Sequence, residues 1–155
     1  MAQLQVTRII EAPIDRVWAA WDAFGDVDRF NPNIRASYLI NASKATGLGA
    51  ERKCEMADGK NFIKERIVGY EPPTRMVIEA FACTLPLKDI RVTLDFAART
   101  CDETEVTLTM NFHPNGILGH LMMPMMKKDM AVALGRLLAG NKAYSEVGLE
   151  IPVAA

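Results

Sequence analysis

The sequence predicts an α+β fold, in which a curved antiparallel sheet of seven strands grips a long C-terminal helix, with one or two short helices after the first strand. Seven segments alternate apolar and polar residues, which is the period of half-buried strands. Tight-turn residues in several of the connections favour antiparallel hairpins rather than helical crossovers. A helical apolar stripe over residues 117–145 then follows the last strand and would cover the sheet.

The first strand is expected at residues 3–11, and the first helix from Pro13 to about Phe24. Proline is well tolerated in the first turn of a helix, and four apolar residues then recur at intervals of three and four. These residues are Ile14, Val17, Trp18 and Trp21. A short second helix is expected before the turn-rich passage that ends in Phe30-Asn31-Pro32-Asn33.

Six further strands are expected from the period-two pattern, at residues 34–41, 49–56, 60–70, 75–84, 88–98 and 104–113. The last two alternate most clearly, which indicates one buried and one solvated face. Their predicted buried residues are Val92, Leu94, Phe96, Val106, Leu108, Met110 and Phe112.

The terminal helix should cover the sheet with a broad apolar stripe. Pro124 is expected to kink or break this helix, because its ring removes one backbone donor and crowds the preceding turn. The stripe consists of Met123, Met126, Met130, Ala133, Leu134, Leu137 and Tyr144.

Composition indicates one globular domain over residues 1–155 and argues against nucleic acid as a partner, because 18 basic and 19 acidic residues form no basic stripe. The longest apolar stretch, 117–126, is too short to span a membrane, so no integral membrane association is expected. Three unpaired cysteines and a polar N-terminus, unlike a signal peptide, predict a cytoplasmic location.

Several local patterns occur in the order typical of one family. They are Ala12-Pro13 with Val17-Trp18, Phe30-Asn31-Pro32, Gly47-Leu48-Gly49-Ala50-Glu51-Arg52, Tyr70-Glu71-Pro72-Pro73-Thr74-Arg75 and Phe112-His113-Pro114. Read with the element order, the chain resembles the START-like superfamily, which has the helix-grip fold, and within it the polyketide cyclase/dehydrase group. The resemblance implies a cavity between sheet and terminal helix that binds lipids, hormones, polyketides or other apolar molecules.

The residues argue against several kinds of reaction centre. The chain has only two histidines, His113 and His120, and no clustered metal ligands, so no metal site is expected. The glycine-rich segment 47–53 lacks the ending of a phosphate loop, and no serine or cysteine lies in a nucleophile elbow. No cofactor is implied.

Glu65 is the main candidate for chemistry, because it shares a strand face with Ile63 and Ile67. Facing an apolar cavity, it would act as a general acid or base or hold a ligand hydroxyl. Alternatively, Glu65 is solvated or pairs with Arg52 or another neighbouring basic residue. Arg52 itself either reaches the cavity to hold an anionic group or extends to the rim. Tyr38, which is expected on the same strand face as Ile34, either offers its hydroxyl to a ligand or belongs to the core.

The leading functional hypothesis is binding of a small hydrophobic molecule in the cavity. One alternative is a cyclase/dehydrase-type enzyme that uses Glu65, Tyr38 or Arg52 in the same cavity. The other is a protein-interaction module that uses the methionine-rich helix, where the apolar residues outside the stripe indicate a cavity mouth, a homodimer contact or a membrane-surface patch. The candidate ligand-binding residues are Phe30, Ile63, Ile78, Val92, Leu94, Phe96, Leu108, Met110, Phe112, Met122, Met126 and Met130.

Overall fold

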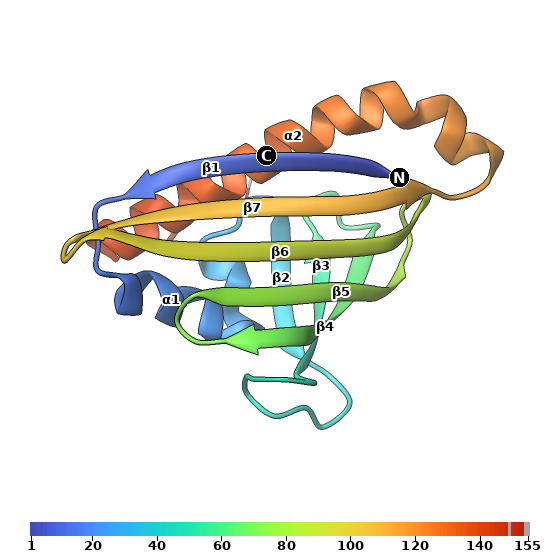
Figure 1. Ribbon diagram of the computed structural model, residues 1–155. Helices are drawn as coiled ribbons and strands as arrows, with labels where there is room; N and C mark the ends of the chain where they lie inside the picture. Colours follow the sequence, from blue (N-terminus) through green and yellow to red (C-terminus); the bar gives the residue numbers. More distant parts are fainter. Residues whose placement is uncertain (149, 154–155) are drawn as a thin grey trace.

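The computed structural model describes residues 1–148 and 150–153, and it contains one sheet and three helices (Figure 1). The helices are α1 (Ile14–Asp22), the 3-10 helix η1 (Phe24–Arg29) and α2 (Gly116–Val147). The strands are β1 (Ala2–Ile10), β2 (Ile34–Leu39), β3 (Glu51–Met56), β4 (Phe62–Glu71), β5 (Arg75–Cys83), β6 (Leu87–Thr100) and β7 (Glu103–Pro114).

All seven strands join one antiparallel sheet in the order β1-β7-β6-β5-β4-β3-β2. Five of the six pairs are neighbours in the chain, as expected for hairpins. The exception pairs β1 with β7, in a register that runs from Ala2 opposite Phe112 to Ile10 opposite Thr104. The predicted fold class is therefore confirmed, with α2 running along the β1 edge of the sheet (Figure 1).

The concave face of the sheet forms the core. In β7, Val106, Leu108, Met110 and Phe112 are buried, as their alternation predicts, and Thr104 donates its hydroxyl to the Ala12 carbonyl at 2.8 Å. A buried hydroxyl needs such a partner, because leaving it unpaired costs free energy.

Helix α1 packs by its tryptophans. The Trp18 ring lies 5.5 Å from that of Tyr70 and 5.3 Å from that of Phe96, and the Trp21 ring lies 5.1 Å from that of Phe30. These edge-on and tilted contacts fill the core at the end of the sheet where α1 lies. The helix predicted from its tryptophan spacing is confirmed.

Strand β2 contains an irregularity that the sequence pattern does not reveal. Ile34 pairs with Met56 and Ala36 with Glu55, so one extra residue is inserted in β2. Such a bulge moves every later side chain to the opposite face. Tyr38 is therefore 41% exposed, and its hydroxyl donates to Glu55 Oε1 at 3.1 Å. The prediction that Tyr38 shares the inner face of Ile34 is wrong.

Helix α2 continues through Pro124, so the helix does not break there. It ends at Val147, and the amide of the following Gly148, which has a left-handed conformation (φ 70°), donates to the Tyr144 carbonyl, as is typical of a helix C-terminus. The second half of α2 is packed into the core, and five of its residues are buried, namely Leu137, Leu138, Gly140, Asn141 and Ser145. In the first half only Gly119 is buried, so this half is packed more loosely against the sheet.

Among the described residues, no helix is long and apolar enough to cross a membrane.

Candidate functional site

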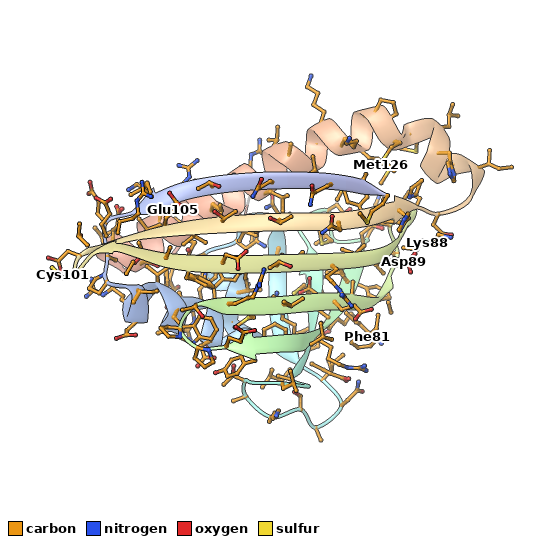
Figure 2. All side chains as sticks on the ribbon, viewed as in Figure 1. Phe81, Lys88, Asp89, Cys101, Glu105 and Met126 are labelled. Carbon is orange, nitrogen blue, oxygen red and sulfur yellow. The ribbon has the colours of Figure 1, made fainter. Side chains whose placement is uncertain are left out.

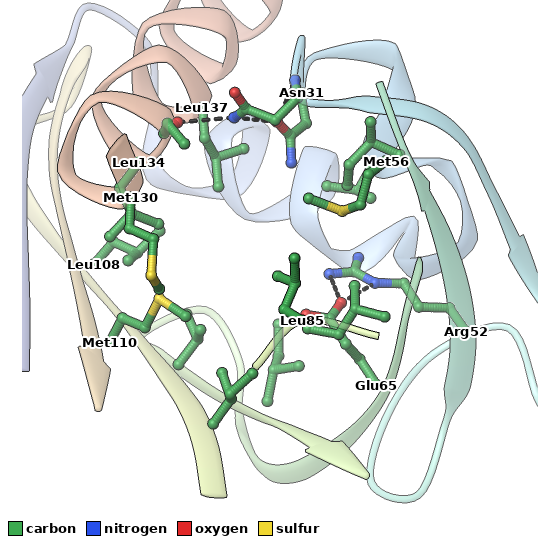
Figure 3. Close-up of a pocket in the computed structure, with 18 of the residues that line it drawn as sticks. Asn31, Arg52, Met56, Glu65, Leu85, Leu108, Met110, Met130, Leu134 and Leu137 are labelled. Atoms are coloured by element: carbon green, nitrogen blue, oxygen red, sulfur yellow. Dashed lines mark hydrogen bonds and ion pairs between the residues drawn. The ribbon is translucent and has the colours of Figure 1, made fainter. Parts of the chain in front are cut away.

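A cavity of about 160 Å³ lies between the inner face of the sheet and helix α2 (Figure 3). The sheet, η1, α1 and α2 all contribute to its wall. Its lining residues are Trp21, Val27, Asn31, Asn33, Ile34, Arg52, Met56, Ile63, Glu65, Ile78, Leu85, Leu87, Ile90, Val92, Leu108, Met110, Met130, Ala133, Leu134 and Leu137. Most of these side chains are apolar, so the cavity favours an apolar occupant.

Helix α2 contributes a flexible part of the wall. In Figure 3 the side chains of Met130 on α2 and Met110 on β7 point toward one another at one side of the cavity. Both side chains are unbranched and can adopt several shapes, so this side can adjust to the outline of a bound molecule.

Arg52 and Glu65 form a buried ion pair on the opposite side of the cavity (Figure 3). They lie opposite one another on the neighbouring strands β3 and β4, and their side chains are only 5% and 12% exposed. Glu65 Oε2 accepts hydrogen bonds from Arg52 Nε and Nη2, both at 2.7 Å. The structure thus combines two readings that the sequence left as alternatives, because Glu65 lies in the cavity wall and also pairs with Arg52.

The Arg52 guanidinium also contacts Phe24, in addition to the Glu65 carboxylate. Its Nη1 donates to the Phe24 carbonyl at 2.9 Å, and its Cζ lies 4.1 Å above the Phe24 ring. Burial opposes its charge, but the pKa of Arg52 is raised, because the interactions with Glu65 and Cys54 together outweigh the effect of burial. Arg52 therefore stays charged, and each of its three nitrogens faces a protein oxygen.

The two oxygens of Glu65 differ in their surroundings. Oε2 receives both Arg52 bonds and a weak contact from the Cys54 thiol, at 3.8 Å from Sγ. Burial raises the pKa of Cys54 to about 12, so this thiol is neutral near pH 7. Among the described residues, none donates a hydrogen bond to Oε1, which leaves it as an acceptor for a group in the cavity.

Asn33 ties helix α2 to the loop after η1. Its Nδ2 donates to the Ala133 carbonyl on α2 and to Asn31 Oδ1, both at 2.8 Å. Asn31 Oδ1 also accepts from the Asn33 amide at 3.1 Å. The segment Phe30-Asn31-Pro32-Asn33, noted in the sequence as a turn, thus holds α2 over the cavity.

Six of the twelve candidate ligand-binding residues line the cavity, namely Ile63, Ile78, Val92, Leu108, Met110 and Met130. Four others, Phe30, Leu94, Phe96 and Phe112, are buried in the core outside the cavity. Met122 and Met126 lie half-buried on α2, away from its lining. The aromatic side chains of α1 fill the space around Phe96 and Phe30, so the cavity occupies only part of the concave face.

The sequence pattern does not reveal the contribution of the β5–β6 connection and the first residues of β6. Leu85, Leu87 and Ile90 line the cavity, although the predicted strands leave the first two in a turn. Their apolar character was the available signal, but the change in register between Lys88 and Arg91 hides the alternation. Trp21, Val27, Ile34 and Met56 were also not singled out as lining residues.

The two histidines lie at the end of the sheet where α2 begins. His113 lies near the end of β7, with Nδ1 3.3 Å from Asp89 Oδ2, and His120 is exposed on α2. Within residues 1–148 and 150–153, no three His, Cys, Asp or Glu side chains are grouped to hold a metal ion.

A family model described as "Polyketide cyclase / dehydrase and lipid transport" matches residues 1–146. The chain belongs to this family. Its resemblance to the START-like superfamily and to the polyketide cyclase/dehydrase group is confirmed. No curated protein sequence matches the chain significantly.

Solved structures share the fold of this polyketide cyclase/dehydrase and lipid transport family member. A protein from Thermus thermophilus superposes with a TM-score of 0.78 at 18% identity, covering 93% of this chain and 97% of that one. An aromatase/cyclase from a Streptomyces species gives 0.74 at 12% identity, covering 97% and 99%. A START superfamily protein from Mycobacterium smegmatis gives 0.73 at 10% identity, covering 90% and 96%.

Proposed function

We propose that this protein binds a small, mainly apolar molecule that carries a hydroxyl or similar hydrogen-bond donor. The observation that carries the proposal is the position of Glu65 Oε1 in a mostly apolar wall, where none of the described residues donates a hydrogen bond to it. Arg52 is neutralised by Glu65 and bonded to Phe24, so the pair offers a ligand an acceptor more readily than a positive charge. Family membership supports an apolar ligand of this kind.

The cavity volume limits the size of the part that is enclosed. About 160 Å³ is close to the volume of an engineered cavity of about 150 Å³ that binds benzene. One aromatic ring therefore fits without rearrangement. A larger molecule would extend past the half-buried lining residues Asn33, Met56 and Met130, or would displace the methionine side chains.

Phenol and toluene provide a matched pair of probes, because they have similar size and differ in the hydroxyl. The double variant Arg52→Met/Glu65→Leu replaces the ion pair with apolar side chains. We expect the affinity for phenol, relative to that for toluene, to fall roughly tenfold or more in the double variant, because a hydrogen bond to a charged acceptor is lost. Titrations followed by NMR of the backbone amides would measure both affinities.

Val68→Ala is a control for this comparison, because Val68 is an exposed β4 residue outside the cavity. It should leave both affinities unchanged. If neither probe shifts the amides of cavity residues in the unmodified protein, ligand binding in this cavity is refuted. If both bind and their ratio is the same in the double variant, the role given to Glu65 is wrong.

A second candidate function is catalysis in the same cavity, and the uncommitted Glu65 oxygen favours it. A carboxylate held in an apolar site can take a proton from a carbon next to a ketone. The Streptomyces structure of the same fold is described as an aromatase/cyclase.

Catalysis by Glu65 predicts that the protein speeds the exchange of the α-hydrogens of 2-tetralone with D2O. Glu65→Gln should abolish this effect, whereas Val68→Ala should not. Exchange at the buffer rate with the unmodified protein would exclude this activity for the probe.

A further inference from the structure

Helix α2 carries a second apolar stripe on the face turned away from the sheet. Ile117, Leu121, Met125 and Val132 recur at intervals of four and seven, which places them on one side of the helix. Ile117 is 90% exposed and Leu121 78% exposed. Leu118, also exposed, widens the stripe at its beginning. These residues form what we call the outer stripe.

The inner face of the same helix segment is already occupied. Met123, Met126 and Met130 are partly buried and pack against the core. The outer stripe therefore has no role in covering the sheet. A contiguous exposed apolar surface of this kind on a folded chain usually marks a contact with a partner or a membrane.

Basic residues lie within the outer stripe and beside it, and we call them its basic rim. Lys127 and Lys128 are exposed on α2, and Lys128 lies within the stripe between Met125 and Val132. A shallow recess beside the first turns of α2 is lined by Met1, Lys88, His113 and His120, among others. The acidic groups nearby are Asp89, which lies 3.3 Å from His113, and Asp129. Figure 2 shows Lys88 and Asp89 at the end of the sheet where α2 begins.

We propose that the outer stripe and its basic rim dock on the surface of an anionic membrane. The apolar side chains would enter the boundary between headgroups and acyl chains, while the lysines contact lipid phosphates. The position of Lys128 favours a membrane over a second copy of this chain. At a membrane its long side chain can keep the ammonium among the headgroups, whereas a paired helix would bury the charge.

This docking is independent of the ligand proposed for the cavity. It would, however, lay the membrane against the same helix that supplies Met130, Ala133, Leu134 and Leu137 to the cavity wall. The first half of α2, which is packed more loosely than the second, is the part that would touch the lipid.

The test is flotation of the full chain with vesicles of phosphatidylcholine alone and of phosphatidylcholine mixed with phosphatidylglycerol. We expect binding to the anionic vesicles, little binding to the neutral ones, and release at high salt, because salt screens the attraction. Leu121→Ser and Ile117→Ser should each weaken binding. Lys127→Ala/Lys128→Ala should weaken binding roughly twenty-fivefold, because each lysine near an anionic surface contributes about fivefold.

Matched controls lie elsewhere on the surface. Leu48→Ser removes an exposed leucine from the β2–β3 loop, and Arg16→Ala/Lys44→Ala removes two exposed basic residues that belong neither to the outer stripe nor to its basic rim. Both should bind as the unmodified protein does. All of these positions are exposed, so the variants should fold, which circular dichroism would verify.

Three results would overturn the docking proposal. The first is failure of the unmodified protein to float with anionic vesicles. The second is an equal loss of vesicle binding in the controls and in the stripe variants. The third is a concentration-dependent dimer, seen by sedimentation without lipid, that Leu121→Ser disrupts; this would assign the outer stripe to a second copy. Phenol uptake from solution should be unchanged in the stripe variants, so failure of docking and failure of the ligand hypothesis remain distinguishable.

Discussion

Replacing Gly140 with alanine should lower the free energy of unfolding by about 3 kcal/mol or more. Adding atoms to a packed site typically costs about 1 to 3 kcal/mol when the neighbours are side chains that can move. At Gly140 the neighbour is backbone. A Cβ there would lie 1.9 Å from the Phe30 carbonyl oxygen, so α2 and the loop after η1 would have to separate. Urea unfolding would measure the change.

Gly135 provides the matched control in the same helix. A Cβ at Gly135 meets no atom within 4 Å, so Gly135→Ala adds helix propensity without a clash. It should raise the free energy of unfolding by roughly 0.5 to 1 kcal/mol. Equal stability of the two variants would show that the close approach of α2 to Phe30 does not exist in solution.

Phenol binding should also weaken in Gly140→Ala, because the displaced helix α2 carries part of the cavity wall.

Arg52→Met should be the second strongly destabilising change, with an expected loss of about 3 to 5 kcal/mol. The substitution leaves the Glu65 carboxylate in the wall without its ionic partner. It also removes the bond to the Phe24 carbonyl and the packing of the guanidinium on the Phe24 ring. Denaturant unfolding near pH 7 would measure the loss, and a change below about 1 kcal/mol would contradict the buried pair, since that is the range of surface pairs.

The double variant Arg52→Met/Glu65→Leu controls for this effect. Replacing both members of a buried pair with apolar residues is often neutral or stabilising, so its stability should recover most of the loss. That recovery is what makes the double variant suitable for the phenol comparison. Glu65→Gln alone should lower stability, because Arg52 would keep its charge and lose the carboxylate.

Most of the fold could be predicted from local patterns. Period-two alternation in β6 and β7 indicates which residues face the core, because a half-buried strand must turn alternate side chains inward. The tryptophan spacing of α1 and the long stripe of α2 predict their inner faces for the same reason, with a period near 3.6. These signals are strong because each one is repeated over several turns or strand positions.

The residues that line the site were less predictable, because they depend on shifts in the pairing register of β2 and β6. One extra residue in β2 turns Tyr38 outward, and no change in composition announces it. The change of register at the start of β6 brings Leu87 and Ile90 into the wall together. A periodic reading assumes an uninterrupted ladder, so it fails wherever a bulge interrupts one.

The division between cavity and core also depended on distant contacts. Phe96 and Met110 share the same inner face, yet Trp18 packs on Phe96 while Met110 remains in the cavity wall. A sequence pattern shows only that both residues point inward. It contains no information on which inward space another element will fill.

By itself, the sequence determined the order of the elements, the inner faces of the long strands and helices, and the family resemblance, because these follow from short repeated patterns along the chain. Only the tertiary structure decided that Arg52 and Glu65 meet, that Asn33 holds α2, and that the cavity occupies one part of the concave face. The physical reason is that pairing and filling depend on distances between residues from separate elements, which local periodicity does not specify.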